Sequence, residues 1–401
     1  MHTITCRNLR TLAAAAFIAM TLAAASAQTE SIIHTFTGSG DGNPSNGALV
    51  GDGKGNFFGT TEGAGPNGAG TVYELSPGSN GTWTEQILYS FSWTNGAAAP
   101  YGGVVFDGNG NLYGTTAYGG ANSMGTVFEL SPGSNGVWTE KILYSFAGGT
   151  SGQNPFGGIV FDRAGNIYGI ASGGANRNGV AYELVPGSNG SWTEKVLHSF
   201  AGKNDGSALF FGSTVVLDAA GNVYGVASDG PHDYGIVFEL VHGMNGGWTE
   251  KILYAFTGPT DGGGPFAGLV FDAAGNLYAG ATFGIFELNP QSNGTWTQKV
   301  IYSFKGGSDG VFPESPLTVD KAGNLYGMTS GGGRHRGTVF ELSPGANGTW
   351  TEKILHRFAP DGVDGVTPFL GGLVFDANGN LYGTTQSGGA SGYGVAFKIT
   401  P

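Results

Sequence analysis

One internal repeat constrains the fold of this chain more than any other feature. The string Asp-x-x-Gly-Asn, followed by an apolar and an aromatic residue, occurs seven times. A Trp-Thr string that runs into an apolar stretch, and variants of Gly-Thr-Val-Phe-Glu-Leu, recur with it. A constant period of this length indicates a solenoid or a propeller. The repeated asparagines lie 48 to 56 residues apart, at Asn56, Asn111, Asn166, Asn222, Asn276, Asn324 and Asn380.

Each repeat, called a unit below, contains four short segments that read as strands. In the second unit they are 103–107, 111–116, 125–131 and 138–146. They are rich in β-branched and aromatic residues and are separated by glycine-rich turns. A sustained 3.6-residue period is missing, so the sequence predicts an all-β fold with almost no helix. Four antiparallel strands per unit are typical of a β-propeller blade.

The two ends of the chain divide one unit between them. The seventh unit stops after its third strand, at 396–399, while residues 29–36 share the pattern Thr-Glu-x-Ile-x-His-x-Phe with residues 351–358. A ring explains this division, because the N-terminal strand then covers an open sheet edge in the last unit. We therefore predict a seven-bladed β-propeller over residues 28–401, closed by the pairing of residues 29–36 into the last blade.

Residues 1–27 have the pattern of a signal peptide. Arg7 and Arg10 precede an apolar run over 12–25, and Ala25-Ser26-Ala27 ends it with small residues. A retained N-terminal anchor is the alternative, but a membrane span needs about 20 apolar residues. We expect cleavage before Gln28 and a secreted product, periplasmic or extracellular. Cleavage removes Cys6, the single cysteine, so packing alone must hold the mature chain together.

The negative net charge of the chain excludes some classes of binding partner. The whole chain has a formal net charge of −12, and loss of Arg7 and Arg10 makes the mature chain more acidic still. Acidity argues against DNA, RNA and anionic lipid. We expect a monomer without membrane insertion, without a cofactor and without a bound metal. Glycine-rich strings abound among the 77 glycines, but no helix follows them, so a nucleotide site is excluded.

The combined motifs resemble a known family. The segments 271–278 (Phe-Asp-Ala-Ala-Gly-Asn-Leu-Tyr), 337–345 (Gly-Thr-Val-Phe-Glu-Leu-Ser-Pro-Gly) and 350–355 (Trp-Thr-Glu-Lys-Ile-Leu) are similar to the GloVer tandem repeat of exported bacterial proteins. The resemblance covers residues 29–401. It implies a propeller-like fold and export, and it brings no catalytic residues with it.

Residues present in most units are first interpreted as structural. Each repeated aspartate, such as Asp107, precedes a tight turn and can accept bonds from backbone N–H groups two residues on. A calcium-binding loop is the functional alternative, but these turns have fewer potential calcium ligands than an EF-hand loop. We interpret His34, His198 and His356 as packing variants of a tyrosine that other units carry at this position. Strand-three glutamates lie near the lysines that open strand four and should form cross-strand pairs with them. The glutamates are Glu129, Glu239 and Glu341, and the lysines are Lys141, Lys251 and Lys353.

Recognition residues are expected where the units differ. Turns between strands one and two, and between strands three and four, are uniform and share one face. The loop from strand two to strand three (the 2→3 loop) and the connection to the next unit (the 4→1 connection) share the other face, which we call the loop face. Variable loops on a rigid scaffold usually carry function. In the fifth unit the 2→3 loop is shorter by seven residues, since Tyr278 to Glu287 spans 9 residues and Tyr113 to Glu129 spans 16.

The 2→3 loops of the fourth and sixth units, on either side of this short loop, contain charged and aromatic residues. We predict a ligand groove there, flanked by six residues whose arginines suit a carboxylate or sulfate and whose tyrosine can stack on a sugar ring. The alternative is a solvated loop that varies freely. Lys203, Asp205, Phe210, Phe211, Asp309 and Glu314 lie in nearby 4→1 connections. The six predicted ligand-binding residues are His232, Asp233, Tyr234, Arg334, His335 and Arg336.

Two functions of different class fit this sequence. The favoured one is a non-enzymatic binding or adhesion scaffold that recognises an acidic glycan or another polysaccharide or cell-surface polymer. The other is a secreted propeller hydrolase or lyase that acts on polysaccharide with His232, Asp233 or His335 as acid and base. An enzyme should gather acids around the central channel, whereas strand one begins with small residues such as Gly102, Gly103 and Gly372.

Overall fold

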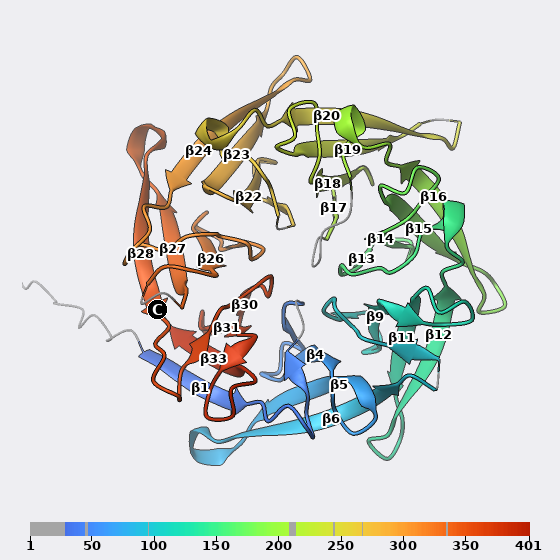
Figure 1. Ribbon diagram of the computed structural model, residues 1–401, viewed down its shortest axis with the longest axis vertical. Helices are drawn as coiled ribbons and strands as arrows, with labels where there is room; N and C mark the ends of the chain where they lie inside the picture. The colour runs from blue at the N-terminus through green and yellow to red at the C-terminus, as the bar shows by residue number, and fades with distance from the viewer. Residues whose placement is uncertain are drawn as a thin grey trace, which may run out of the picture.

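The computed structural model describes residues 29–44, 47–94, 96–207, 214–243, 245–266, 268–333 and 336–401. The chain folds as a β-propeller, with antiparallel sheets arranged around a central axis (Figure 1). In these ranges there is no α-helix and no helix able to cross a membrane. The predicted signal peptide, residues 1–27, lies outside them. Five 3₁₀-helices occur in turns and connections: η1 (Ser79–Gly81), η2 (Gly149–Ser151), η3 (Lys203–Asp205), η4 (Pro259–Asp261) and η5 (Ala346–Gly348).

Five of the described sheets each have four strands from a single unit. From first to fourth strand, unit two contains β8 (Val105–Phe106), β9 (Leu112–Thr116), β11 (Thr126–Pro132) and β12 (Trp138–Ser145). Unit three contains β13 (Val160–Phe161), β14 (Ile167–Ala171), β15 (Val180–Pro186) and β16 (Trp192–Ser199). Units four to six form β17 (Val216–Leu217), β18 (Val223–Ala227), β19 (Ile236–His242), β20 (Trp248–Ala255); β21 (Val270–Phe271), β22 (Leu277–Ala281), β23 (Gly284–Pro290), β24 (Trp296–Ser303); and β25 (Thr318–Val319), β26 (Leu325–Thr329), β27 (Thr338–Pro344), β28 (Trp350–Arg357).

The sixth four-stranded sheet joins the two ends of the described chain. Its outermost strand is β1, which pairs antiparallel with β33 from Thr29 opposite Thr400 to Thr35 opposite Val395. A seven-stranded sheet holds the first unit, and a two-stranded sheet lies beside the seventh. The strands of these three sheets are β30 (Val374–Phe375), β31 (Leu381–Thr384), β33 (Val395–Thr400), β1 (Thr29–Thr35); β2 (Asn43–Pro44), β3 (Val50–Gly51), β4 (Phe57–Gly63), β5 (Gly68–Pro77), β6 (Trp83–Ser92), β7 (Ala97–Ala98), β10 (Tyr118–Gly119); and β29 (Gly365–Val366), β32 (Ser387–Gly388).

Burial explains why the strand sequences differ by position. The second and third strands of a unit are apolar almost without alternation and are buried on both faces, as in β9 and β11. The fourth strand alternates between more and less exposed residues, as in β12, because it forms the outer edge. Predicted strand boundaries in the second unit agree within one residue for these three strands. The first strand is shorter than expected, only Val105–Phe106 rather than 103–107.

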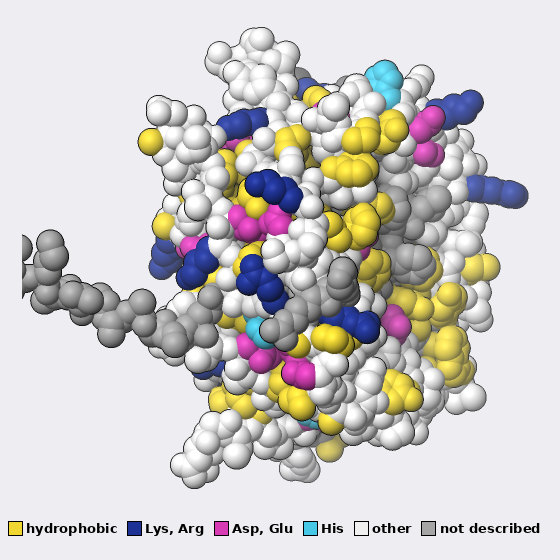
Figure 2. All heavy atoms as spheres, turned by 60° about the vertical axis from the view of Figure 1, so that its left-hand side comes forward, with side chains coloured by type: hydrophobic (Ala, Val, Ile, Leu, Met, Phe, Trp, Pro, Cys, Tyr) yellow, Lys and Arg dark blue, Asp and Glu magenta, His cyan; other side chains and the backbone are white. Residues whose placement is uncertain are grey.

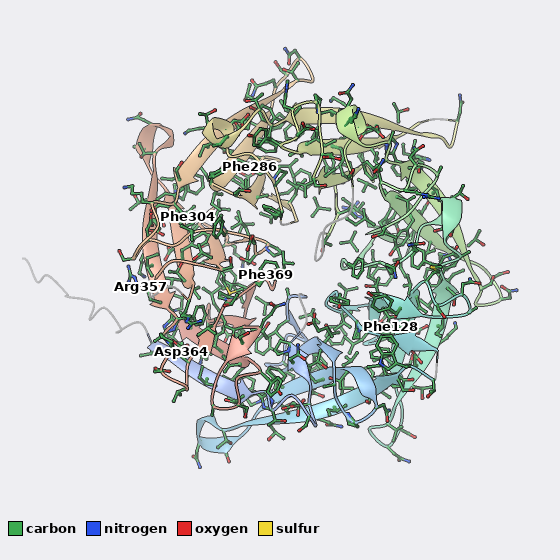
Figure 3. All side chains as sticks on the ribbon, viewed as in Figure 1. Phe128, Phe286, Phe304, Arg357, Asp364 and Phe369 are labelled. Atoms are coloured by element: carbon green, nitrogen blue, oxygen red, sulfur yellow. The ribbon has the colours of Figure 1, made fainter. Side chains whose placement is uncertain are left out.

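The core lies between neighbouring sheets. An aromatic residue at the end of the fourth strand, or directly after it, packs edge-to-face against an aromatic residue in the third strand of the next sheet. Two such pairs, Phe91–Phe128 and Phe256–Phe286, have centroids 5.1 and 5.0 Å apart, and all four rings are fully buried. Each pair of this kind adds about 0.5–1.5 kcal/mol beyond area burial. Figure 3 shows Phe128 and Phe286 in this position in two different sheets.

The repeated aspartates make the predicted turn between strands one and two. In the second unit Asp107 Oδ1 accepts the N–H groups of Asn109 and Asn111 at 2.8 and 2.9 Å, and Oδ2 accepts the Asn111 side chain at 2.8 Å. Gly110 has φ +88°, the left-handed conformation that favours glycine. The hydrogen bonds of this turn use both carboxylate oxygens, which favours the structural interpretation over the calcium loop.

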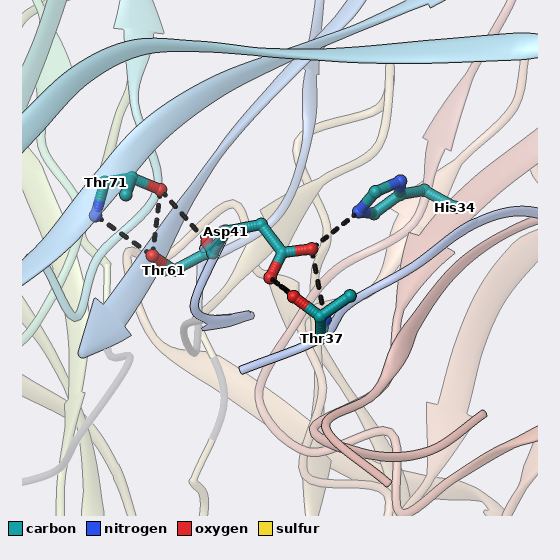
Figure 4. A network of polar contacts seen from close by, with 5 residues as sticks. All are labelled: His34, Thr37, Asp41, Thr61 and Thr71. Carbon is teal, nitrogen blue, oxygen red and sulfur yellow. Dashed lines mark hydrogen bonds and ion pairs between the residues drawn. The ribbon is translucent and has the colours of Figure 1, made fainter. Parts of the chain in front are cut away.

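Polar clusters connect neighbouring sheets at the outer edge of the ring. Each has a tyrosine or histidine of the fourth strand, a residue of the 4→1 connection, and an acid or amide of the next fourth strand. One cluster contains Tyr302, Asp309 and Glu352, with the Tyr302 hydroxyl 2.8 Å from Asp309 and 3.0 Å from Glu352. In another, His34 lies 3.2 Å from Asp41, whose carboxylate also accepts bonds from Thr37 (Figure 4).

Acidic and basic side chains are also mixed along this edge. The strand-three glutamates Glu183, Glu239 and Glu341 lie 3.2, 3.4 and 3.8 Å from the lysines opposite them, Lys195, Lys251 and Lys353. Two of the three predicted pairs, Glu239–Lys251 and Glu341–Lys353, are therefore confirmed, and Glu183–Lys195 is a further pair of the same kind. Glu129 and Lys141 lie opposite each other in the strand register. Figure 2 shows Lys and Arg interspersed with Asp and Glu on the side that carries β28. The visible side lacks a large patch of one sign.

The 4→1 connections and the 2→3 loops lie on one face, as predicted. The connection before a unit pairs with the end of that unit's second strand, as Gln153 does with Ser172 and Pro265 with Ala281. The same connections also bind the 2→3 loop of the preceding unit, since Asn154 N–H donates to the Met124 carbonyl at 2.7 Å. Each connection thus fixes two units together and forms the floor of the loop face.

Candidate functional site

The predicted residues of the fourth unit lie in an exposed 2→3 loop between β18 and β19. His232 and Asp233 are exposed, and Asp233 has φ +61° with its N–H bonded to the Gly230 carbonyl at 3.1 Å. The Tyr234 side chain is 39% exposed and lies beside Gly258 and Gly263 of the connection to the fifth unit. Tyr234 therefore stands at the boundary between units four and five.

The predicted residues of the sixth unit lie in the 2→3 loop between β26 and β27. Arg336 is exposed, and its carbonyl accepts the Thr367 N–H at 2.9 Å. Because Thr367 belongs to the connection into the seventh unit, Arg336 stands at the boundary between units six and seven. Tyr234 and Arg336 hence occupy different boundaries of the ring. Arg334 and His335 lie outside the described residues.

The additional residues named for this region lie in different places. Asp205 and Asp309 belong to the polar clusters at the outer edge, where they contact His198 and Tyr302. Glu314 lies in the connection before β25 and accepts a bond from Ser330 at 2.7 Å; burial raises the pKa of its carboxyl. Lys203 begins η3 with φ +49°. Phe210 and Phe211 lie outside the described residues.

Exposed aromatic side chains gather on the loop face. Within the described ranges, every aromatic side chain exposed by more than a third belongs to a 2→3 loop or a 4→1 connection. Single exposed apolar side chains are ordinary on a protein surface, whereas a contiguous group of them marks an interaction site. The six residues are Trp93, Tyr118, Tyr234, Phe283, Phe312 and Tyr393.

Four aromatic residues form one continuous group across units one to three. Ring centroids of Trp93 and Tyr118 are 5.9 Å apart, those of Tyr118 and Phe156 are 6.4 Å apart, and those of Phe156 and Tyr101 are 5.3 Å apart. Trp93 Nε1 donates to the Gly68 carbonyl at 3.3 Å, which fixes the indole over the first unit. We call Trp93, Tyr118, Phe156 and Tyr101 the aromatic cluster.

A half-buried carboxyl lies beside this cluster. Burial raises the pKa of Glu62, which accepts a bond from Asn43 at 3.4 Å. Burial also raises the pKa of the Tyr101 hydroxyl, and the nearby Glu62 and Tyr118 raise it further. A carboxyl whose pKa is raised by burial, close to these aromatic residues, makes Glu62 a candidate functional residue.

Sequence reasoning did not identify the aromatic cluster. The signal available was a Pro-aromatic pair before strand one, at Pro100-Tyr101, Pro155-Phe156, Pro265-Phe266 and Pro368-Phe369. Since this pair recurs, it resembles structural repetition. Figure 3 shows Phe369 of the same series on the inner side of the ring. Trp93, the largest member of the cluster, occurs only in the first unit. Because Trp93 and Phe156 are far apart in the sequence, the sequence did not indicate that they belong to one cluster.

The central channel contains an apolar cavity of about 310 Å³. Its described lining comes from the first strands and consists of glycine, alanine, valine, leucine, isoleucine, proline and Thr214. Such a lining offers no titratable side chain. Glu62, near the end of β4, and Glu314, in the connection before β25, are not among the residues that line this cavity.

Comparison with known proteins places the chain among repeat proteins of one family. A family model described as the Gloeobacter/Verrucomicrobia repeat matches residues 13–230 and 211–401. No curated protein matches the sequence. The motifs found above and this match cover the same units.

Solved structures share the fold at low sequence identity. A streptogramin B lyase is 13% identical with a TM-score of 0.55, over 93% of this chain and 97% of that chain. Virginiamycin B lyase from Staphylococcus aureus is 13% identical with a TM-score of 0.54, over 93% and 99%. The extracellular domain of a putative hybrid two component system from B. thetaiotaomicron is 14% identical with a TM-score of 0.57, over 93% of this chain and 42% of that chain. These similarities establish the propeller fold.

Proposed function

The chain belongs to the Gloeobacter/Verrucomicrobia repeat family, and we propose that it is a secreted, non-enzymatic binding scaffold for glycans, with the loop face as its binding surface. The ligand is a polysaccharide or another surface polymer. The observation that carries this proposal is the aromatic cluster, because sugar rings stack on exposed aromatic faces and aromatic residues dominate binding hot spots.

The proposed scaffold is a seven-bladed ring. The first unit, inside the seven-stranded sheet, supplies the same four strands as the others through β3 to β6. Pairing of β1 with β33 supplies the fourth strand of the last blade. Two aromatic contacts support closure: Phe358 packs on Phe397 at 5.3 Å, and Phe36 packs on Tyr73 at 5.3 Å. They repeat the contact made between the other neighbouring sheets.

Removal of the aromatic cluster tests glycan binding. The chain would be screened for binding to a neutral β-glucan, a neutral α-glucan and a uronate polymer by affinity electrophoresis. We expect Trp93→Ala with Tyr118→Ala to weaken binding at least tenfold, because stacking of an aromatic ring contributes 1 kcal/mol or more. Phe283→Ala is the matched control, since Phe283 is exposed on the same face outside the cluster. Equal loss in both variants, or unchanged binding, would contradict the site.

Acidic polymers test the loops of units four and six. We expect Arg334→Ala with Arg336→Ala to weaken binding of the uronate polymer while a neutral glucan binds as before, because arginine pairs with carboxylates. Since Tyr234 stands at the boundary of units four and five and Arg336 at that of units six and seven, a polymer that contacts both must extend across the fifth and sixth units. A uronate polymer that binds the double variant with unchanged affinity excludes this part of the proposal.

A polysaccharide lyase or hydrolase is the second candidate. Two observations favour it: two proteins of similar fold are lyases, and Glu62 is a half-buried carboxyl with a raised pKa beside Tyr101. In this function Glu62 would transfer the proton at the scissile bond. Product analysis after long incubation with each polymer separates the two functions. Released oligosaccharides that disappear with Glu62→Gln would establish the enzyme, whereas binding without products supports the scaffold.

A further inference from the structure

Three of the polar clusters at the outer edge contain a histidine in place of tyrosine. They are His34–Asp41–Glu85, His198–Asp205–Glu250 and His356–Asp364–Glu30. Each residue offers one ligand atom, and in each cluster these atoms lie within 4.8 Å of one another. The ring packing is the same as with tyrosine, since His356 meets Phe358 at 4.8 Å and Tyr302 meets Phe304 at 5.0 Å. The predicted packing role of the histidines is thus confirmed, and a nitrogen ligand is added to it.

The cluster of His356, Asp364 and Glu30 differs from the other two in its free oxygen atoms. Asp364 Oδ2 accepts the Ala359 N–H at 2.8 Å and lies 2.9 Å from His356 Nε2. Asp364 Oδ1 and Glu30 Oε1 are buried without a hydrogen-bond partner. The Asp364 side chain is only 9% exposed, so its free oxygen cannot be satisfied by bulk water.

In the other two clusters, both carboxylate oxygens of the aspartate have hydrogen-bond partners. Both oxygens of Asp41 accept bonds from Thr37, and one also contacts His34. Both oxygens of Asp205 contact His198, and Oδ2 also accepts the Ala201 N–H. The His356 cluster alone among the three therefore combines an imidazole with two unpartnered buried carboxylate oxygens.

We propose that Glu30, His356 and Asp364 bind one divalent transition-metal ion, of which Zn²⁺ is the best match. Imidazole and carboxylate are ordinary zinc ligands at about 2.0–2.2 Å, which places tetrahedral ligand atoms about 3.3 Å apart. The 2.9 Å between His356 and Asp364 is close to this separation, and a small movement of Glu30 completes three ligands with a fourth position for water.

The ion would connect the N-terminal strand to two neighbouring segments near the other end of the chain. Glu30 belongs to β1, His356 to β28 and Asp364 to the connection before β29. Figure 3 shows Asp364 near the outer edge, where β1 enters the ring. A bound ion therefore fastens the N-terminal strand to the neighbouring unit. It also offsets the negative charge that Asp361 and Asp364 exert on Glu30.

Calorimetric titration of the untagged, EDTA-treated chain with Zn²⁺ tests this site. The variants are His356→Tyr and Glu30→Gln, which the chain itself uses at the matching positions Tyr302 and Gln298. We expect the intact chain to bind one Zn²⁺ and to melt at a higher temperature with it. Both variants should bind Zn²⁺ at least tenfold more weakly while remaining folded by circular dichroism.

His198→Tyr is the matched control, because its cluster lacks a free aspartate oxygen, and we expect it to bind Zn²⁺ like the intact chain. Substitution of Co²⁺ gives a second readout, a visible absorption band of a tetrahedral site that disappears in His356→Tyr. Absence of Zn²⁺ binding by the intact chain would overturn the proposal. Binding that survives both His356→Tyr and Glu30→Gln would overturn it as well.

Discussion

At the scale of single residues, the repeated aspartate makes the strongest local contribution. Asp320 Oδ1 accepts two N–H groups at 2.8 and 2.9 Å, and Oδ2 accepts Asn324 at 2.8 Å and Tyr326 at 3.2 Å. Partial burial raises the pKa of Asp320, but these bonds outweigh it and hold the pKa below its ordinary value. We expect Asp320→Ala to lower the free energy of unfolding by about 1–3 kcal/mol in denaturant titration.

Asp320→Asn distinguishes the two interpretations of this turn. An amide oxygen can still accept the two N–H bonds at Oδ1, so a structural turn should lose less stability in Asp320→Asn than in Asp320→Ala. A calcium loop would lose its ion in both variants, and Ca²⁺ would stabilise only the intact chain. Stabilisation of the intact chain by millimolar Ca²⁺ that both variants lack would contradict the structural turn.

At the scale of elements, the polar clusters make contacts between outer strands sensitive to pH. Burial raises the pKa of Glu352 to about 7 from an ordinary 4.5, and a hydrogen bond with Asp309 raises it as well. The folded state therefore favours the protonated acid, and this stability is lost as pH rises through 7. We expect the free energy of unfolding to fall between pH 5 and pH 8, with Glu352 contributing about 1 kcal/mol after solvent screening.

Glu352→Gln is the test of this effect. The amide imitates the protonated acid, and Gln298 at the matching position already donates to the Asp261 carbonyl at 2.7 Å. The variant should be less dependent on pH in denaturant titrations at pH 5 and pH 8. A variant with the same pH dependence as the intact chain would show that Glu352 does not titrate between these values.

Much of this element scale could be predicted from sequence. The β-branched and aromatic runs, the glycine-rich turns with their aspartates and the Trp-Thr strings placed strands two, three and four of the second unit within one residue. Contacts between units were harder to predict from the sequence, because residues in contact, such as Glu352 and Tyr302, lie 50 residues apart. The aromatic cluster was not predicted for the same reason, because Tyr118 brings Trp93 and Phe156 together only after three units have folded.

At the scale of the whole molecule, the proposed ring depends on a strand contributed by the other end of the chain. Ile33 and Phe36 are buried in the cluster that includes Tyr73 and Tyr382 of the two adjoining units. Deletion of residues 28–37 removes both side chains and exposes β33 as a free edge. Loss of buried Phe and Ile alone costs about 2–5 kcal/mol each. We therefore expect a large fall in melting temperature, far more than for a frayed terminus.

Addition of the missing strand as a peptide separates closure from general damage. A peptide of residues 28–37 should bind the shortened chain by strand addition and raise its melting temperature, because the edge of β33 and the pocket for Phe36 remain in place. The same peptide with Phe36→Ala loses the ring contact with Tyr73 and should restore much less. A shortened chain that melts like the intact one would mean that the ring does not need this strand. It would then be an open array of sheets whose stability comes from neighbouring contacts alone.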